Sequence, residues 1–105
     1  MGADGHRYDS MFEARVADEL GLRKKANDIK DYQRQVRLDL RVNGQHVCFY
    51  KIDFIIIHND GHKEFLEVKG LELPLWRIKW RLLEILHEEM EPGSELTVVK
   101  QSSRW

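Results

Sequence analysis

An Asn-Gly turn between two alternating segments constrains this chain more strongly than any other feature of its sequence. From Val36 to Val42 apolar residues alternate with polar ones, and Asn43-Gly44 follows directly. Alternation of this kind is typical of a strand with one buried face. Asn-Gly is the strongest short signal for a two-residue hairpin turn. We therefore predict a strand over residues 33–42 and a second strand, over about residues 46–58, that pairs with it in antiparallel fashion.

A helix is expected ahead of this hairpin. Ser10 is followed three residues later by Glu13, and apolar residues then recur at helical spacing as far as Gly21. A serine with a glutamate three residues on is a capping-box pattern, which marks the start of a helix. We predict a helix over residues 10–20, preceded by a flexible tail over residues 1–7.

The second half of the chain continues with a strand, a helix and a strand. The turn residues 59–61 predict a third strand over residues 62–70 that pairs back on the second. A period of 3.6 residues predicts a helix over residues 75–90, and the short β-branched segment 96–100 predicts a last strand reached by a crossover. The predicted fold is α/β, of an α+β-like kind. Its element order is αβββαβ, and helices flank a mixed sheet that contains an antiparallel meander.

Length and composition narrow the class of protein. The 105 residues suffice for one domain, which we place at residues 8–105. The longest apolar run covers only residues 54–57, and the N-terminus lacks an apolar secretory segment. We therefore expect no membrane association and a soluble, cytoplasmic protein. The single cysteine, Cys48, fits a reducing compartment.

Charge is distributed unevenly along the chain, although the net charge is only −1. Residues 21–41 carry seven basic and three acidic side chains, a net charge of +4. Residues 84–95 carry five acidic side chains and no lysine or arginine. One interpretation is a basic face that binds a polyanion, with an acidic face turned away. The alternative is a solvated surface with uneven charge.

Two acids and a lysine interrupt the apolar strands. In the second strand the even-numbered residues from 48 to 56 are expected to face one packed layer, and Asp53 lies among apolar neighbours on the other face. In the third strand Glu67 and Lys69 share a face, because strand side chains alternate. Pairing of these strands can bring the two carboxylates together, and their repulsion is relieved by protonation or by Mg²⁺ or Mn²⁺. The alternative is an ordinary Glu67–Lys69 or Asp53–Lys51 ion pair on a solvated sheet face.

Three further polar residues are candidates for the same site. Glu13 lies on the helical stripe that should face the sheet, although a capping role with Ser10 is the alternative. Gln35 lies on the polar face of the first strand, where it can reach a metal-bound water or a phosphate. Lys79 interrupts the apolar surface of the second helix and can reach back toward the acids or contact a phosphate.

The apolar arc of the second helix is too wide to pack on one sheet, so part of it is expected to bury against another subunit or under the tail. Its members are Leu75, Trp76, Ile78, Trp80, Leu82, Leu83, Ile85 and Leu86.

The five histidines lack the spacing of metal ligands, and we interpret them as surface residues.

Taken in order, these residues resemble the PD-(D/E)XK nuclease superfamily, most closely its small phage-encoded members. Phage and archaeal Holliday-junction resolvases are similar in the same places. The resemblance covers most of residues 8–100, and one departure is Ile52, where the superfamily often has proline before the first acid. It implies a restriction-endonuclease-like αβββαβ core. The segments that carry it are Tyr8-Asp9-Ser10-Met11-Phe12-Glu13, Gln35-Val36-Arg37, Asp53-Phe54 and Glu67-Val68-Lys69-Gly70.

The resemblance also implies residue roles. Asp53, Glu67 and the backbone carbonyl of Val68 would hold Mg²⁺, for which Mn²⁺ can substitute, and Glu13 would complete this site or share a second metal. Lys69 would orient or help deprotonate the attacking water. Glu13, Asp53, Glu67 and Lys69 are thus the expected catalytic residues.

The implied substrate is DNA, and a chain of this length is expected to recognise its backbone and shape. We expect a homodimer that resolves Holliday junctions or other branched DNA, in the host cytoplasm if the protein is phage-encoded. The alternatives are a general nicking or flap endonuclease and a noncatalytic DNA-binding subunit with a nuclease fold. The expected DNA-binding residues are Arg23, Lys24, Lys25, Arg34, Arg37, Lys51, Arg77 and Arg81.

Overall fold

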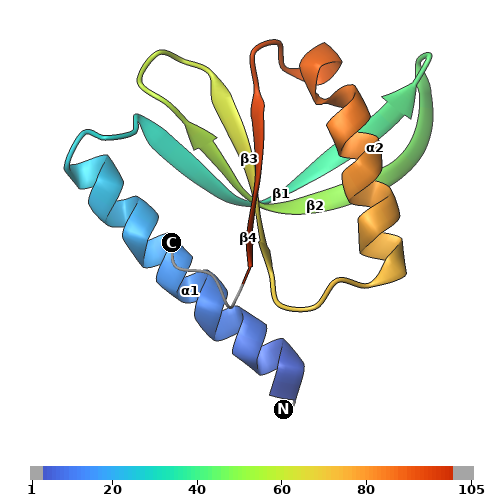
Figure 1. The fold of residues 1–105 in the computed structure, drawn as a ribbon. Coiled ribbons are helices and arrows are strands. Elements are labelled where there is room, and N and C mark those ends of the chain that lie inside the picture. The colour runs from blue at the N-terminus through green and yellow to red at the C-terminus, as the bar shows by residue number, and fades with distance from the viewer. Residues whose placement is uncertain (1–3, 101–105) are drawn as a thin grey trace.

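A computed structural model describes residues 4–100 of the chain as two helices and a four-stranded sheet (Figure 1). Neither helix of this described part is both long and apolar enough to cross a membrane. In chain order the elements are α1 (Asp4–Lys25), β1 (Asp31–Val42), β2 (Gln45–Ile57), β3 (Lys63–Lys69), α2 (Pro74–Met90) and β4 (Glu95–Lys100).

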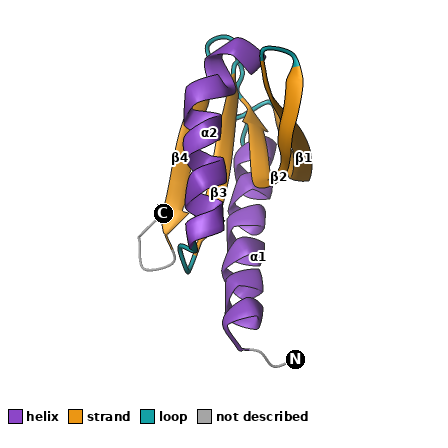
Figure 2. Cartoon of the chain, turned by 90° about the vertical axis from the view of Figure 1, so that its right-hand side faces the viewer, coloured by secondary structure: helices purple, strands orange, loops and turns teal. Residues whose placement is uncertain are grey.

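The sheet confirms the predicted fold class and element order. Its strand order is β1-β2-β3-β4, with β1–β2 and β2–β3 antiparallel and β3–β4 parallel. Asn43 and Gly44 join β1 to β2 with φ angles of 52° and 78°, as a type I′ hairpin turn requires. The helix α2 supplies the crossover between β3 and β4. Figure 2 shows β4 at one edge of the sheet and β1 at the other.

The first helix is longer than predicted at both ends. It begins at Asp4, so residues 4–7, predicted as tail, are helical, and Ser10 lies inside the helix instead of at its N-cap. Residues 1–3 of the predicted tail lie outside the described part. The helix also continues through Gly21, since one glycine costs a helix only about 1 kcal/mol. It ends instead at Lys25, two residues before Asn27, which has a φ of 63°.

Hydrogen bonds explain why the helix ends there. The amide of Asp28 donates to the carbonyl of Arg23 over 2.9 Å, and the amide of Asn27 donates to Lys24 over 3.0 Å. This arrangement around a residue with positive φ is a Schellman-type end. Asparagine tolerates the left-handed conformation better than most residues, so Asn27 can stop the helix where Gly21 did not.

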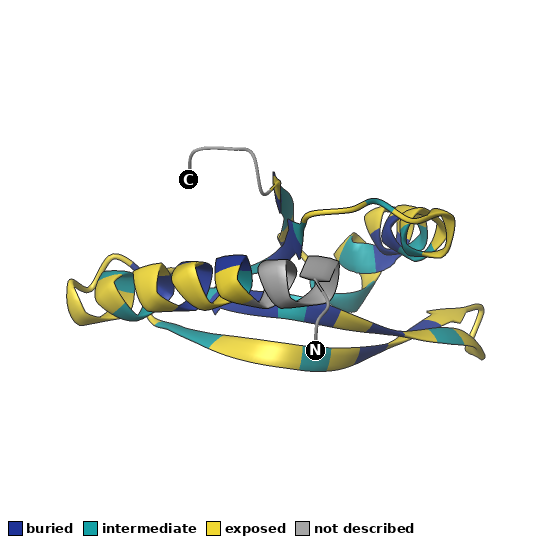
Figure 3. Cartoon of the chain, turned by 90° about the horizontal axis from the view of Figure 1, so that it is seen from below, coloured by how far each residue is buried: buried dark blue, intermediate teal, exposed yellow. Residues whose placement is uncertain are grey.

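The core is divided into two clusters, one under each helix. The cluster under α1 contains Val16 and Leu20 of the helix with Phe54, Ile56 and Leu66 of the sheet. The cluster under α2 contains Trp80, Leu83 and Leu86 together with Leu38, Leu40, Tyr50, Ile52, Ile55 and Phe65. Figure 3 shows buried and exposed positions along both helices, as packing on one side predicts.

This division corrects the prediction that the even-numbered residues of β2 face one packed layer. Phe54 and Ile56 belong to the cluster under α1, whereas Tyr50 and Ile52 belong to the cluster under α2. The change falls at Asp53. In the β1–β2 register Arg34 pairs with Phe54 and Val36 with Ile52, but no pairing joins Gln35 to Asp53. The long hairpin is thus shared between both cores, and the unpaired positions Gln35 and Asp53 lie between them.

A prediction follows for the packing of α1. Leu20 is 0% exposed and lies in the core. Leu22, the same residue type two positions further along the helix, is 63% exposed. We expect Leu20→Ala to lower the free energy of unfolding by about 3 kcal/mol, because it leaves a cavity. Leu22→Ala should change it by less than about 0.5 kcal/mol. Urea denaturation followed by circular dichroism measures both, and equal losses would contradict this packing.

Candidate active site

The candidate site lies where β2 separates from β3. The β2–β3 register runs from Ile57 opposite Lys63 to Phe54 opposite Leu66 and ends there. The next pair would be Asp53 opposite Glu67. Instead, the backbone amide of Val68 donates to Oδ2 of Asp53 over 2.8 Å. The Asp53 carboxylate therefore accepts a hydrogen bond from a β3 amide that no β2 carbonyl reaches. It is held at the fork, which is the point where β2 and β3 separate.

Gln35 connects Asp53 to the first helix. Its side-chain Nε2 donates to Oδ1 of Asp53 over 3.3 Å and also to Oε2 of Glu13. Two carboxylates from distant parts of the chain therefore share one amide nitrogen. Gln35 has a φ of 54°, a left-handed conformation that is uncommon for a residue other than glycine or asparagine. Strained backbone of this kind persists where the surrounding structure enforces it, and it occurs often at functional sites.

Glu67 is the most buried carboxylate of the group, with 3% of the residue exposed. Its Oε1 accepts a hydrogen bond of 2.7 Å from the Tyr50 hydroxyl, which in turn accepts one of 2.9 Å from the Trp76 indole. Its Oε2 lies 3.2 Å from the Lys69 ammonium. That ammonium also lies over the Trp76 ring, 4.9 Å from the centroid. Glu67 and Lys69 thus form the pair that their shared strand face predicted.

Burial is the main cause of raised pKa values among these acids. Burial raises the pKa of Asp53 to about 7, the negative charges of Glu67 and Glu13 add to the effect, and the Val68 amide and Lys69 oppose it. Burial likewise raises the pKa of Glu67, against the hydrogen bonds from Tyr50 and Lys69. Burial and the charge of Glu67 also raise the pKa of the Tyr50 hydroxyl. The site therefore favours protons or a cation between its carboxylates.

The donor set fits a hard divalent cation. Glu13 and Asp53 both lie against the Gln35 amide nitrogen, and Glu67 is close enough to Asp53 to raise its pKa. Carboxylate oxygens without nitrogen or sulfur donors are the ligands that Mg²⁺ and Mn²⁺ prefer. The residues that could hold such an ion are Glu13, Asp53, Glu67 and, from the resemblance, the backbone carbonyl of Val68.

Sequence reasoning missed the contribution of Tyr50 and Trp76. Both were interpreted as apolar residues of a packed layer and of a wide helix face. The signal that could have found them is their polar group, because a buried Tyr hydroxyl and a Trp N–H normally require a partner. Lys79, in contrast, does not reach the acids, because its ammonium donates to the backbone carbonyl of Phe49 over 2.9 Å.

The predicted DNA-binding residues do not form one continuous patch. Arg23, Lys24 and Lys25 lie in the last turn of α1, which Figure 1 shows across the molecule from α2. Lys24 pairs with Asp31 over 3.0 Å. The remaining residues follow the hairpin and α2: Arg34, Arg37, Lys51, Arg77 and Arg81.

Two of the hairpin residues, Arg34 and Arg37, have aromatic or acidic neighbours. The Arg34 guanidinium lies over the Phe54 ring at 5.6 Å and 3.9 Å from the Glu13 carboxylate, so this cation stands at the edge of the acidic site. Arg37 lies over the Phe49 ring at 4.3 Å. Lys51 pairs with Arg37 across the β1–β2 ladder. These cations give the hairpin a basic surface that begins beside Glu13.

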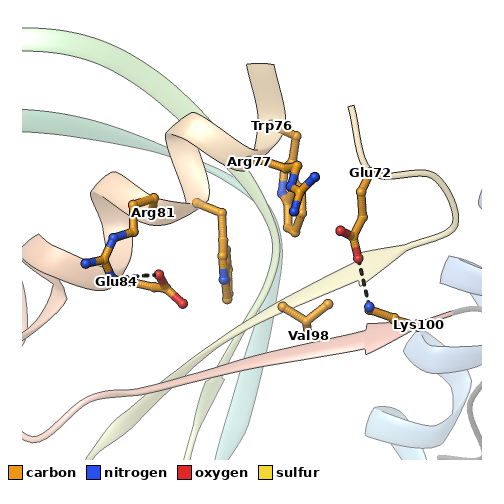
Figure 4. Close-up of a pocket in the computed structure, with 8 residues that line it drawn as sticks. Glu72, Trp76, Arg77, Arg81, Glu84, Val98 and Lys100 are labelled. Atoms are coloured by element: carbon orange, nitrogen blue, oxygen red, sulfur yellow. Dashed lines mark hydrogen bonds and ion pairs between the residues drawn. The ribbon is translucent and has the colours of Figure 1, made fainter. Parts of the chain in front are cut away.

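A groove of about 400 Å³ lies between α2 and β4. Arg77 and Arg81 line it together with Trp76, Trp80 and Val98, and a Glu72–Lys100 ion pair of 2.9 Å closes one side (Figure 4). Trp76 belongs to both features, because its indole donates to Tyr50 and its ring lies under Lys69. The groove therefore adjoins the acidic site through this one side chain.

The raised pKa of Asp53 predicts a pH-dependent stability. A carboxyl that ionises near pH 7 in the folded protein and near 3.8 in the unfolded chain binds more protons when folded. Without divalent cations, the wild-type protein should therefore lose stability as the pH rises from about 4 to about 7. Asp53→Asn should remove this part of the loss, and above pH 7 the variant should be more stable by about 2 kcal/mol, since partial exposure reduces the full linkage effect.

Urea denaturation at pH 5 and pH 8 in EDTA measures this difference, with Asp18→Asn on the exposed side of α1 as the control. Equal stability of Asp53→Asn and the wild-type protein at pH 8 would contradict the raised pKa. Added Mg²⁺ should reduce the difference between the two proteins, because a cation bound by the ionised carboxylates stabilises the folded state.

Comparison with known proteins gives a family without a described activity. No curated protein and no solved structure matches the chain. The family model described as "Protein of unknown function (DUF1064)" matches residues 1–103, which is nearly the whole sequence. The chain therefore belongs to this family, DUF1064.

Proposed function

We propose that this protein is a metal-dependent DNA endonuclease that hydrolyses phosphodiester bonds in branched DNA, with the four-way junction as the preferred substrate. One observation carries the proposal: Glu13, Asp53, Glu67 and Lys69, which are distant in sequence, gather around the fork between β2 and β3. The same residues carry the resemblance to the PD-(D/E)XK nucleases. A reason for keeping partly buried carboxylates together is that a cation binds them during function.

Each residue has a chemical role in this proposal. Mg²⁺ held by Asp53, Glu67 and the Val68 carbonyl, with Glu13, would supply a Lewis acid that stabilises charge on the scissile phosphate. Lys69 would hold the attacking water and offset negative charge at phosphorus from its position 3.2 Å from Glu67. Tyr50 and Trp76 are positioning residues, because their hydrogen-bond chain fixes Oε1 of Glu67.

Recognition of shape is the mode of binding that suits this surface. The cations that flank the acidic site, Arg34 and Arg37 on one side and Arg77 and Arg81 on the other, come from the hairpin and from α2. Arginines on two separate elements can contact the backbones of two diverging duplex arms, and phosphate contacts alone carry no sequence information. This division favours branched DNA over a single linear duplex.

The proposal includes a homodimer. Leu75, Ile78 and Ile85 lie along α2 at intervals of three and seven residues and are 64%, 67% and 60% exposed. Leu71 and Leu73, just before the helix, are exposed as well. A stripe of this spacing matches a helix that packs against a second helix. A second copy of the chain would cover it and would supply the second active site that paired cuts in a junction require.

Cleavage of three labelled substrates of matched sequence tests the activity: a four-way junction, a flap and a linear duplex, each with Mg²⁺, Mn²⁺ or EDTA. We expect paired, metal-dependent cuts restricted to the junction. Asp53→Asn should lower the rate by at least about 100-fold, since even outer-shell changes at metal sites cost 10- to 100-fold. Asp18→Asn is the matched control and should cut at the wild-type rate.

Other results would change the proposal in defined ways. Equal cutting of all three substrates would indicate a general endonuclease. Metal-dependent cutting of the flap alone would indicate a flap endonuclease. Tight junction binding without cleavage, equal for the wild-type protein and Asp53→Asn, would reject catalysis and favour a noncatalytic DNA-binding subunit.

The dimer has its own test. Sedimentation equilibrium of the wild-type protein should give the mass of two chains, and Ile78→Glu should give one, because a buried unpaired charge opposes association. Glu84→Gln, which lines the groove between α2 and β4 and so lies away from this stripe, should leave the dimer intact. A wild-type protein that stays monomeric at concentrations where it cuts both junction strands would exclude this interface.

A further inference from the structure

A second group of metal-ligand side chains lies at the other end of β3, away from the acidic site. His58 follows β2 and His62 precedes β3, while Glu95 is the first residue of β4. The turn between the histidines is closed by backbone bonds, from His58 to the His62 carbonyl and from Gly61 to the His58 carbonyl, each 2.9 Å long. The parallel β3–β4 register pairs Glu64 with Glu95 and so brings the carboxylate to the turn.

The donor atoms of this group face one another. The rings of His58 and His62 are stacked, with centroids 4.3 Å apart and planes inclined by 9°. Oε1 of Glu95 lies 3.3 Å from Nε2 of His62 and 3.8 Å from Nε2 of His58. The three ligand atoms all lie within 4.8 Å of one another. A cation among them would therefore contact two imidazoles and one carboxylate.

Asp60 fixes the orientation of His62. Its Oδ1 lies 2.5 Å from Nδ1 of His62 and accepts the His62 backbone amide over 3.0 Å. Because Nδ1 must be the donor to this carboxylate, Nε2 of the neutral ring carries a lone pair directed at Glu95. Two acceptors that face each other require a proton or a cation between them. A carboxylate that holds the far nitrogen of an imidazole is also the usual outer shell of a histidine bound to a metal.

Glu64 contacts His58 in a different way, at the same ring nitrogen that faces Glu95. Its Oε1 lies 2.7 Å from Nε2 of His58, and its Oε2 accepts a hydrogen bond of 2.6 Å from the Thr97 hydroxyl. The carboxylate is therefore held between β4 and the turn, next to the nitrogen that would bind a metal. It offers a fourth oxygen ligand without any change in the backbone.

We propose that His58, His62 and Glu95 bind a transition-metal cation of the Zn²⁺ type, at a site separate from the candidate active site. Imidazole nitrogens with one or two carboxylate oxygens suit Zn²⁺ and similar ions, whereas Mg²⁺ prefers oxygen ligands alone. The proposal departs from the interpretation of His58 and His62 as surface residues. The sequence does not reveal this site, because only its two histidines are neighbours around one turn. Its third ligand comes from β4, 33 residues after His62.

The expected role of the bound ion is structural. At the edge of the sheet, β4 pairs only with β3, and the site would join the start of β4 to the β2–β3 turn. A ligand that binds only the folded protein raises its stability, by an amount that grows with the logarithm of the free ligand concentration once this exceeds Kd. The bound metal should therefore hold the edge strand in register, at a distance from the chemistry proposed for the fork.

Calorimetric titration of ZnCl₂ into the full chain, stripped with a chelator and then dialysed, tests this proposal. It is done in the Asp53→Asn variant, so that the acidic site contributes less. We expect one Zn²⁺ per chain with a Kd on the order of 1 µM. Both His62→Ala and the more conservative His62→Gln should weaken binding at least about tenfold. His46→Ala, which removes an exposed histidine of the β1–β2 hairpin, should leave the affinity unchanged.

Two further measurements keep the test independent of folding defects. Co²⁺ in place of Zn²⁺ should give visible absorption bands that are lost in His62→Gln, while circular dichroism shows that the variant is folded. Zn²⁺ should raise the Tm of the parent protein and not that of His62→Gln. The proposal would be overturned if the parent protein does not bind Zn²⁺, or if His46→Ala and His62→Gln weaken binding equally. If the His62 imidazole titrates with pH and is unaffected by Zn²⁺, a proton occupies the place between His62 and Glu95. That result would also overturn the proposal.

Discussion

The hydrogen bond from the Val68 amide to the Asp53 carboxylate is the interaction on which the candidate site depends. At Asp53 the hairpin passes from the core under α1 to the core under α2, so β2 cannot continue its pairing with β3. A β3 amide would then be left without a backbone partner, at a cost of about 1–3 kcal/mol if it stayed unsatisfied. Asp53 satisfies it at 2.8 Å. The residue that closes the fork is thereby held beside Glu67, the residue that would have been its strand partner.

Placing the Asp53 carboxylate at the fork has an electrostatic cost, because it brings a buried acid close to other acids. Burial raises the pKa of Asp53 to about 7, and the nearby charges of Glu67 and Glu13 add to this effect. Gln35 itself keeps a left-handed backbone in the middle of a strand. An asparagine at position 53 could accept the Val68 amide without the charge. A neutral side chain at position 53 would be sufficient for the fold. Backbone strain and charge repulsion at this one point are therefore features expected of a site that is kept for function.

Local patterns predicted most of the fold. Asn43-Gly44 gave the hairpin because only a few residue pairs accept positive φ at both positions, and the Glu67–Lys69 pair followed from the alternation of a single strand. Both inferences need only neighbours in sequence. The predicted end of α1 was wrong because Gly21 is only a weak stop signal. The helix continues to Lys25 and stops before Asn27, which has the left-handed backbone of a helix end.

The parts of the site that could not be predicted depend on where strands diverge or cross. The Asp53–Val68 bond depends on the point at which β2 leaves β3, and alternation along β2 gave no sign that its even-numbered residues serve two cores. The approach of Glu95 to His62 depends on the parallel register of β4 after a helical crossover. Sequence periodicity determines which face a side chain occupies, but it does not determine which residue of a distant strand lies opposite.

The seven residues of β3 connect the two groups of candidate metal ligands. Glu64 near its start supports His58, and Glu67 and Lys69 near its end belong to the fork. Between them, Phe65 and Leu66 are buried in different cores, so the strand is held from both sides. Within residues 4–100, β3 is also the only strand that pairs with β4. A cation at the histidine end would therefore fix the register of β4 against β3 without contacting the fork. The two groups can differ in metal preference because one contains imidazole and the other only oxygen ligands.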